Sequence, residues 1–127
     1  MKKLTIRSKA IGEVTAELYA ERSPKTVEAI GAALPITARA NTWGDEIYFS
    51  IGVTVKPEHA QDVVEKGALA YWPPGKAFCI FFGPTPASRG AESRAASPVT
   101  VFGRVMGDPA VFKRVKSGDE IIIEHAE

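Results

Sequence analysis

The side chains best suited to contact a ligand are the two tryptophans, which stand beside two predicted turns. Trp43 precedes Gly44, which can take the positive φ of a hairpin tip; the Trp43 ring there either covers a groove or packs back on its own hairpin. Tyr71 and Trp72 alternate across one predicted strand, so only one of these rings can point inward. The outward ring offers a flat surface to a proline ring or another apolar ligand, with core packing as the alternative.

Three charged residues lie near these aromatics and could supply polar contacts. Glu46 and Lys76 adjoin aromatic segments, where a partly buried charge usually has a partner or a task. They either serve a ligand or form a salt bridge with each other. Arg39 lies on an otherwise apolar strand, which favours a guanidinium that faces a pocket and holds a carboxylate or carbonyl oxygen. A solvated, outward Arg39 is the alternative.

Several common kinds of chemistry lack the residues they need. The chain has two histidines, His59 and His125, and no carboxylate is spaced to complete a zinc site or a catalytic triad with them. Cys79 is the single cysteine, so it cannot form an intramolecular disulfide, and its apolar surroundings predict a small buried side chain. No glycine-rich phosphate loop of known spacing is present. We therefore predict no metal site and no cofactor.

Length, charge and hydropathy narrow the class of protein further. The chain has 127 residues, which predicts a single domain over 1–127. Lys and Arg total 16 and Asp and Glu total 15, without long runs of either sign, which argues against a nucleic-acid partner. No stretch reaches the ~18 apolar residues of a membrane span, and no apolar signal segment follows Lys2 and Lys3. We expect a cytoplasmic protein that has no membrane partner.

Short strands dominate the predicted secondary structure of the first half of the chain. Apolar and polar residues alternate on both sides of Gly12, which predicts an opening hairpin. A helix follows over 24–34, with Ser23 as its N-cap and a proline as its first residue. Residues 36–42 and 46–51 then predict two strands of a second hairpin.

The second half predicts more strands, one weakly helical segment, one short helix and one long loop. Strands are predicted over 68–72, 76–82, 99–106 and 120–124, with a weak helix over 57–67 and a short one over 109–115. Residues 83–98 are rich in Pro, Ser, Ala and Gly, which predicts a mobile surface loop. About eight short strands and two helices favour a closed antiparallel barrel or sandwich with helices over its openings.

Several segments resemble the cyclophilin family. Residues 17–28 end a strand and open a helix with Pro-Lys-Thr-Val-Glu, and residues 101–105, Val-Phe-Gly-Arg-Val, are similar to the cyclophilin strand "VFGKV". Residues 41–49 and 71–77 are more specific, because they resemble the small prokaryotic cyclophilin-like proteins, atypical members of that fold. The resemblance covers nearly the whole chain.

The resemblance implies a mainly β, cyclophilin-like fold: an eight-stranded closed antiparallel barrel capped by two short helices. In cyclophilins, the arginine of the motif "FHRxxPxFMxQGGD" donates a hydrogen bond to the peptide as the bond before proline twists, and Arg39 stands at the corresponding place. The Phe-Met-Gln part of the motif is not reproduced, since residues 45–48 occupy that stretch. The resemblance therefore favours ligand binding without strong isomerase activity. A peptidyl-prolyl cis-trans isomerase with a rebuilt site that uses Arg39 is the alternative.

We predict a ligand-binding groove on this barrel. Its lining would be Trp43, Glu46, Tyr48, Phe49, Trp72, Lys76 and Phe82, with Arg39 as the candidate catalytic residue. The ligand would be a small molecule or an extended peptide, with or without proline. The same aromatic surface could instead be the interface of a homo-oligomer.

Overall fold

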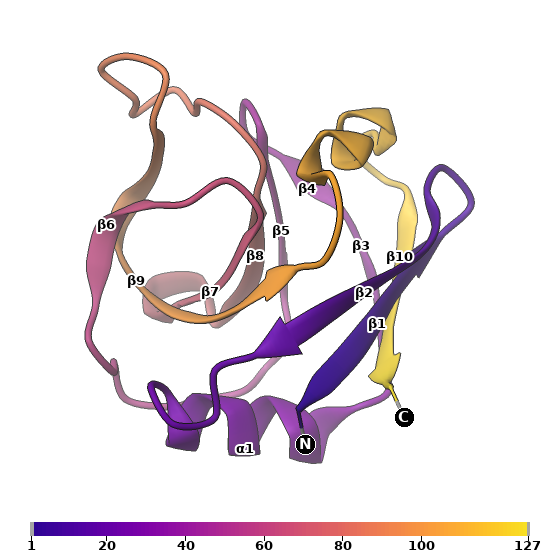
Figure 1. The fold of residues 1–127 in the computed structure, drawn as a ribbon, viewed down its shortest axis with the longest axis vertical. Coiled ribbons are helices and arrows are strands. Elements are labelled where there is room, and N and C mark those ends of the chain that lie inside the picture. Colours follow the sequence, from indigo (N-terminus) through magenta and orange to yellow (C-terminus); the bar gives the residue numbers. More distant parts are fainter. Residues whose placement is uncertain (1, 127) are drawn as a thin grey trace.

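Residues 2–126, which the computed structural model describes, form a curved antiparallel sheet with helical segments at its ends (Figure 1). The strands are β1 Lys3–Ser8, β2 Gly12–Leu18, β3 Ile36–Arg39, β4 Asn41–Thr42, β5 Glu46–Ser50, β6 Gln61–Val64, β7 Ala68–Trp72, β8 Ala77–Phe81, β9 Ser93–Val105 and β10 Glu120–His125. The helical segments are α1 Pro24–Ala33 and two 3-10 turns, η1 Pro73–Gly75 and η2 Pro109–Arg114. Along the sheet the strands run β3, β10, β1, β2, β9, β7, β8, β5 and β4, and β6 pairs with β9.

The predicted mainly β architecture with two short helices is confirmed, although the sheet does not close as predicted. The hydrogen-bonded order ends at β3 and β4, which together make up the strand predicted over 36–42. The strand breaks at Ala40, whose N–H donates to Asp119 O and whose carbonyl accepts from Gly118 N–H, both at 2.8 Å. β3 therefore pairs with β10 while β4 pairs with β5, and the chain itself links the two ends of the sheet.

The helix predicted over 57–67 is wrong, because part of this segment forms β6. Val63 pairs with Arg94 and Val64 pairs with Ser93, both in β9. Val64 is buried whereas Val63 is 38% exposed, which is the alternation of a strand. Pairing with β9 provides hydrogen bonds and burial that two helical turns on their own would lack.

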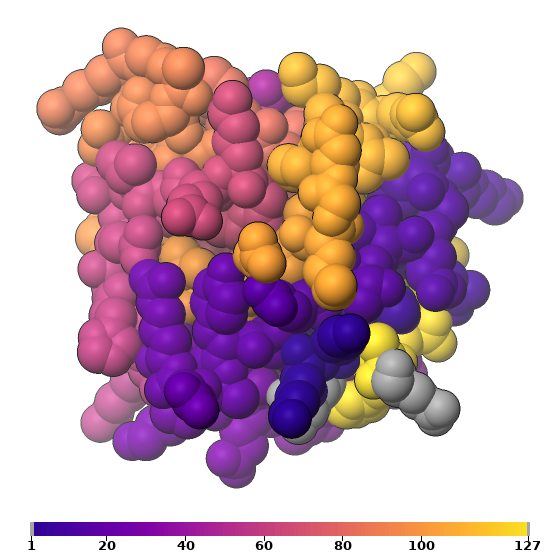
Figure 2. Space-filling model, viewed as in Figure 1, coloured from indigo at the N-terminus to yellow at the C-terminus, as the bar shows by residue number. Residues whose placement is uncertain are grey.

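The loop predicted over 83–98 is shorter than expected, since β9 begins at Ser93. Ser93 Oγ donates to Gly83 O at 2.6 Å, and Thr85 Oγ1 donates to Arg94 O. These hydroxyl groups satisfy backbone carbonyls, which allows a polar segment to pack against the barrel. The rest of the loop projects at one corner of the molecule (Figures 1 and 2).

Helix α1 begins at Pro24 as predicted, but the side chain of Ser23 does not cap it. Ser23 is buried, and its Oγ donates to Val101 O at 2.8 Å, which attaches the start of the helix to β9. The cap comes from a distant residue instead, because the Glu58 carboxylate accepts from the Thr26 N–H at 2.7 Å. A local capping rule therefore misses a contact that the fold supplies.

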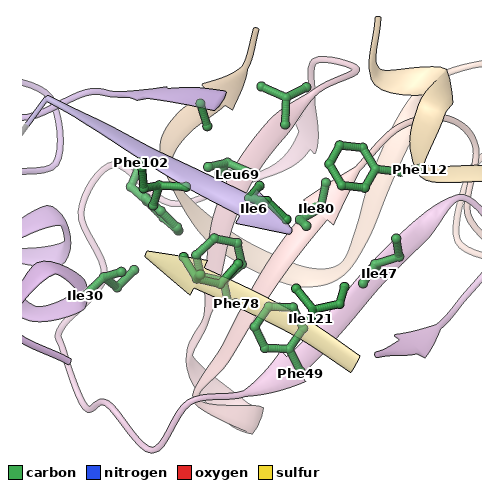
Figure 3. Packing of buried hydrophobic residues seen from close by; sticks show 14 of the residues in the cluster. Ile6, Ile30, Ile47, Phe49, Leu69, Phe78, Ile80, Phe102, Phe112 and Ile121 are labelled. Atoms are coloured by element: carbon green, nitrogen blue, oxygen red, sulfur yellow. The ribbon is translucent and has the colours of Figure 1, made fainter. Parts of the chain in front are cut away.

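The first of two apolar clusters fills the interior of the barrel (Figure 3). Phe78 stacks on Phe49, with ring centroids 5.2 Å apart, and meets the edge of Phe102 at 5.3 Å. Ile30 from α1 and Phe112 from η2 belong to the same cluster. The two helical segments thus cover the core from its two ends.

The second apolar cluster lies on the opposite face of β7 and β8. Its buried members are Val64, Ala68, Ala70, Ala77, Cys79, Phe81, Ala95, Val99 and Val101. Strand alternation decides the membership: in β8, Phe78 and Ile80 enter the barrel core, while Cys79 and Phe81 enter the second cluster. The first half of β9 and β6 cover this outer face, so β8 is buried on both sides.

Candidate functional site

A cavity of about 200 Å³ lies at the margin of the second apolar cluster. Its lining residues come from the β4–β5 hairpin, β5, β7 and β9: Trp43, Glu46, Tyr48, Trp72, Ala95, Ala96 and Val99. Sites for drug-sized ligands usually measure about 300–1,000 Å³. This cavity is therefore suited to one small group of a ligand, and a whole nucleotide would not fit in it.

Strand periodicity brings Glu46 and Tyr48 into the cavity. In β5, Ile47 and Phe49 belong to the barrel core, so the intervening side chains point to the opposite face. There Tyr48 packs at the margin of the second cluster, and Glu46 lines the cavity beside it.

A hydrogen bond and a tight turn hold Trp72 as one wall of the cavity. Its Nε1–H donates to Ser97 Oγ at 2.7 Å, which joins the end of β7 to the first half of β9. The η1 turn passes against the ring, where a Cβ on Gly75 would lie 2.8 Å from Trp72 Cε3. Of the two adjacent rings, Tyr71 is the one that points into the barrel, and its hydroxyl donates to Val53 O at 2.5 Å.

Trp43 lies at the tip of the β4–β5 hairpin, where its N–H donates to Glu46 O at 2.9 Å. Gly44 has the predicted positive φ, +60°. A Cβ on Gly44 would lie 2.9 Å from both Thr85 Cα and Pro86 Cδ, so the tip packs tightly against the loop before β9. This contact fixes the hairpin from which the Trp43 ring reaches the cavity.

Glu46 is the charged residue of the lining and is 6% exposed. Burial raises the pKa of its carboxyl from 4.5 to about 7, and the neighbouring Cys79 thiol opposes that rise. Burial, and then the charge of Glu46, raise the pKa of the Cys79 thiol. The ion pairs formed within residues 2–126 do not include Glu46. This carboxyl can pair with a cation when it is ionised or donate a hydrogen bond when it is protonated.

The architecture and the sequence agree with one family of proteins. A family model described as Cyclophilin-like matches residues 2–124. This chain belongs to the cyclophilin-like family. The family resemblance and the cyclophilin-like fold predicted from the sequence are thereby confirmed.

Two solved structures show how far this similarity reaches. A hypothetical protein from Archaeoglobus fulgidus, known from a solution structure, is 48% identical over 98% of this chain and 95% of its own, with a TM-score of 0.84. A cyclophilin-type peptidyl-prolyl cis-trans isomerase from Cryptosporidium parvum is 16% identical over 99% of this chain and 98% of its own, with a TM-score of 0.59. At that identity the second likeness shows the fold alone. No curated protein matches the cyclophilin-like chain.

Of the eight predicted site residues, four line the cavity: Trp43, Glu46, Tyr48 and Trp72. Phe49 and Phe82 belong to the barrel core, where Phe82 lies against Phe112 with ring centroids 6.2 Å apart. The prediction places Phe49 in the groove together with its neighbour Tyr48. Its strand neighbours show why this was wrong, since adjacent residues of a strand face opposite sides.

Lys76 and Arg39 lie away from the cavity of this cyclophilin-like chain. Lys76 is exposed and precedes Ala77, which pairs with Ser50 at the end of β5. Glu46 is at the opposite end of β5. The salt bridge predicted as an alternative between Lys76 and Glu46 is therefore absent. Arg39 is exposed at the end of β3, and its guanidinium donates to Gly118 O at 3.0 Å. The alternative reading of Arg39 as an outward residue agrees with this position.

Sequence reasoning missed the β9 wall of the cavity, formed by Ala95, Ala96 and Val99, and the Ser97 hydroxyl behind Trp72. Ala95, Ala96 and Ser97 lie in the segment predicted to be a loop, 83–98. Small residues such as these do not by themselves indicate a binding site. Their role depends on the pairing of β9 with β6, which the sequence did not indicate.

Within residues 2–126, no group of three or more His, Cys, Asp or Glu side chains is arranged to hold a metal ion. The same residues include no helix that is long and apolar enough to cross a membrane.

Proposed function

We propose that this cyclophilin-like chain binds a small molecule or an extended peptide by inserting one group of that ligand into the cavity beside Glu46. The observation that carries the proposal is that both tryptophans of the chain line one cavity of about 200 Å³. Tryptophan is strongly enriched where proteins bind ligands and partners, because it combines a large apolar surface with few rotatable bonds. The hydrogen bond from Trp72 to Ser97 keeps one of these rings in place.

We also propose that this binding is not coupled to strong isomerase activity. The barrier to rotation about the peptide bond is ~18–20 kcal/mol, and an isomerase must lower it. It does so with a hydrogen-bond donor directed at the twisted peptide. The position of Arg39 supports our proposal, because its guanidinium is bonded to Gly118 O and it does not line the cavity. The charged side chain that does line the cavity, Glu46, has the opposite sign.

The test is an NMR titration of the chain with a panel of Xaa-Pro peptides and small fragments of neutral, cationic and anionic charge. Binding would shift the indole N–H resonance of Trp72 and the amides of Ala95 and Ala96. Ala96 is exposed, so Ala96→Phe should fill the mouth of the cavity without disturbing the core and should abolish these shifts. Ala32→Phe, at an exposed position of α1, is the matched control and should leave them unchanged.

Exchange spectra of the same peptides decide the second half of the proposal. We expect no acceleration of cis/trans exchange at substoichiometric protein. Accelerated exchange that is lost in Arg39→Ala would establish the isomerase alternative. Shifts that persist unchanged in Ala96→Phe would show that ligands bind elsewhere and would refute the proposed pocket.

A further inference from the structure

Glu46 stands apart from the other buried polar side chains because the Cys79 thiol, a weak donor, is the protein group that bonds to its carboxyl. Within residues 2–126, six polar or charged residues are buried: Ser23, Thr26, Glu46, Thr85, Ser93 and Thr100. The hydroxyls of the other five all form hydrogen bonds with protein atoms. The Glu46 carboxylate has no such bond to a protein N–H or hydroxyl and no basic partner within residues 2–126. A buried carboxyl whose bonding neighbour is a neutral thiol is costly to ionise, and its position in a cavity points to a cationic partner from outside the chain.

No element around the cavity supplies a charge that would satisfy Glu46. β8 presents the Cys79 thiol, β5 presents Tyr48, β7 presents Trp72, and β9 presents small apolar side chains. The cation nearest in sequence to this wall, Arg94, is engaged elsewhere, with its Nε 3.0 Å from Glu92 Oε2 and its Nη1 3.3 Å from Asp62 Oδ2. The site therefore combines one acid that has no ion-pair partner within residues 2–126 with aromatic and aliphatic walls.

We propose that the cavity receives an organic cation, an alkylammonium or methylated ammonium group, with Glu46 as its counter-ion and Trp43, Tyr48 and Trp72 as its walls. This inference rests on the proposed function, since it names the class of ligand for the same pocket. Aromatic faces attract ammonium groups that have shed their water, and a carboxylate neutralises the charge. A cavity of about 200 Å³ holds such a head group while the rest of the ligand stays outside.

Other classes of ligand fit this lining less well. An anion would meet the Glu46 carboxylate without a compensating N–H donor from Lys or Arg. A Ca²⁺ or Mg²⁺ ion needs about six or more oxygen ligands, and the lining offers one carboxylate among apolar side chains. A neutral apolar group would leave the ionised Glu46 buried and unpaired.

Three probes of one shape and different charge test the inference. They are choline, its neutral carbon analogue dimethylbutanol, and the corresponding carboxylate dimethylbutyrate, each titrated into the chain with tryptophan fluorescence and NMR readouts. We expect choline to bind roughly tenfold more tightly than the neutral analogue, and the carboxylate to bind least. A peptide with trimethyllysine and the same peptide with lysine distinguish a side-chain ligand from a free small cation.

The choline titration has an expected pH dependence, because only ionised Glu46 can pair with the cation. Affinity should rise by up to roughly thirtyfold between about pH 5.5 and about pH 8.5 as the ionised fraction grows. Glu46→Gln should remove this dependence and reduce the preference for choline over the neutral analogue to what the aromatic walls alone provide. Glu28→Gln, at an exposed position of α1, should retain both.

Each outcome decides one of the two claims. Equal binding of choline and the neutral analogue at the cavity overturns the cation inference and leaves the proposed pocket standing. Binding of the carboxylate that strengthens at low pH also overturns it, because Glu46 would then act as a protonated donor. Failure of all three probes to bind overturns the inference as well, and the fragment panel with Ala96→Phe then decides separately whether the pocket binds other ligands.

Discussion

Replacing Glu46 by glutamine should stabilise the protein at neutral and alkaline pH. Burial moves the pKa of the Glu46 carboxyl from 4.5 to about 7. Each pKa unit corresponds to about 1.4 kcal/mol, so the ionised carboxylate lowers the free energy of unfolding by about 3 kcal/mol. Glutamine has nearly the same shape and no charge, and it removes this penalty.

The sign of the pH dependence follows from the raised pKa. Between about pH 4.5 and about pH 7, the folded state holds the Glu46 proton that the unfolded state has released, so stability falls as pH rises through this window. Below it the carboxyl is neutral in both states and the penalty vanishes. The gain from Glu46→Gln should therefore be about 3 kcal/mol larger at about pH 8 than at about pH 4.

The assay is guanidinium denaturation followed by tryptophan fluorescence at these two pH values, for the wild type, Glu46→Gln and the exposed control Glu28→Gln. The other ionisable groups are the same in the wild type and in Glu46→Gln, so their contribution cancels in the difference between these two proteins. A gain that is equal at the two pH values would refute the reasoning, since it would mean that the Glu46 charge is already solvated or paired in the fold. A loss of stability at alkaline pH would refute it as well.

Three further predictions concern the parts that position the site. Phe78→Ala removes the ring that stacks on Phe49 at 5.2 Å and should lower the free energy of unfolding by about 3–5 kcal/mol in chemical denaturation. Ser97→Ala removes the acceptor of the Trp72 indole, and should shift that N–H resonance in an NMR spectrum while lowering stability by about 1 kcal/mol. Glu58→Gln weakens the cap of α1. Burial raises the pKa of the Glu58 carboxyl, but the hydrogen bonds that it accepts from the first turn of α1 have the larger combined effect, so this pKa is lowered. This variant should lose about 1 kcal/mol at neutral pH and less in acid, as denaturation at two pH values can measure.

Exposed positions provide the matched controls for these three variants. Val63→Ala in β6, Ser50→Ala in β5 and Glu120→Gln in β10 should each change the free energy of unfolding by less than about 0.5 kcal/mol. A loss for Val63→Ala as large as that for Phe78→Ala would contradict the assignment of the core. An unchanged Trp72 resonance in Ser97→Ala would contradict the hydrogen bond. Equal losses for Glu58→Gln at both pH values would contradict the ionised cap.

The sequence by itself predicted most elements whose pattern is local. Alternation and turn residues predicted the opening hairpin, and strand β7 was predicted over its full length, 68–72. The start of α1 at its proline and the apolar run of β8 were also recognisable. Local patterns of this kind, like a period of two or of 3.6 residues, can be recognised without knowing which segment packs against them. The same periodicity, with the family resemblance, led to four of the residues that line the cavity.

The tertiary structure alone decided which faces of these strands are covered and by what. The first half of β9 has the composition of a loop, and it becomes a wall of the cavity because β6 pairs with it and its hydroxyls bind backbone carbonyls. Phe49 was predicted to line the groove, but it belongs to the core because its position in β5 directs its side chain into the barrel. Glu46 acquired its unusual pKa only through burial by segments distant in the chain. Local spacing encodes the orientation of a side chain relative to its own strand, whereas the environment that the side chain meets depends on long-range pairing, and that pairing created the site.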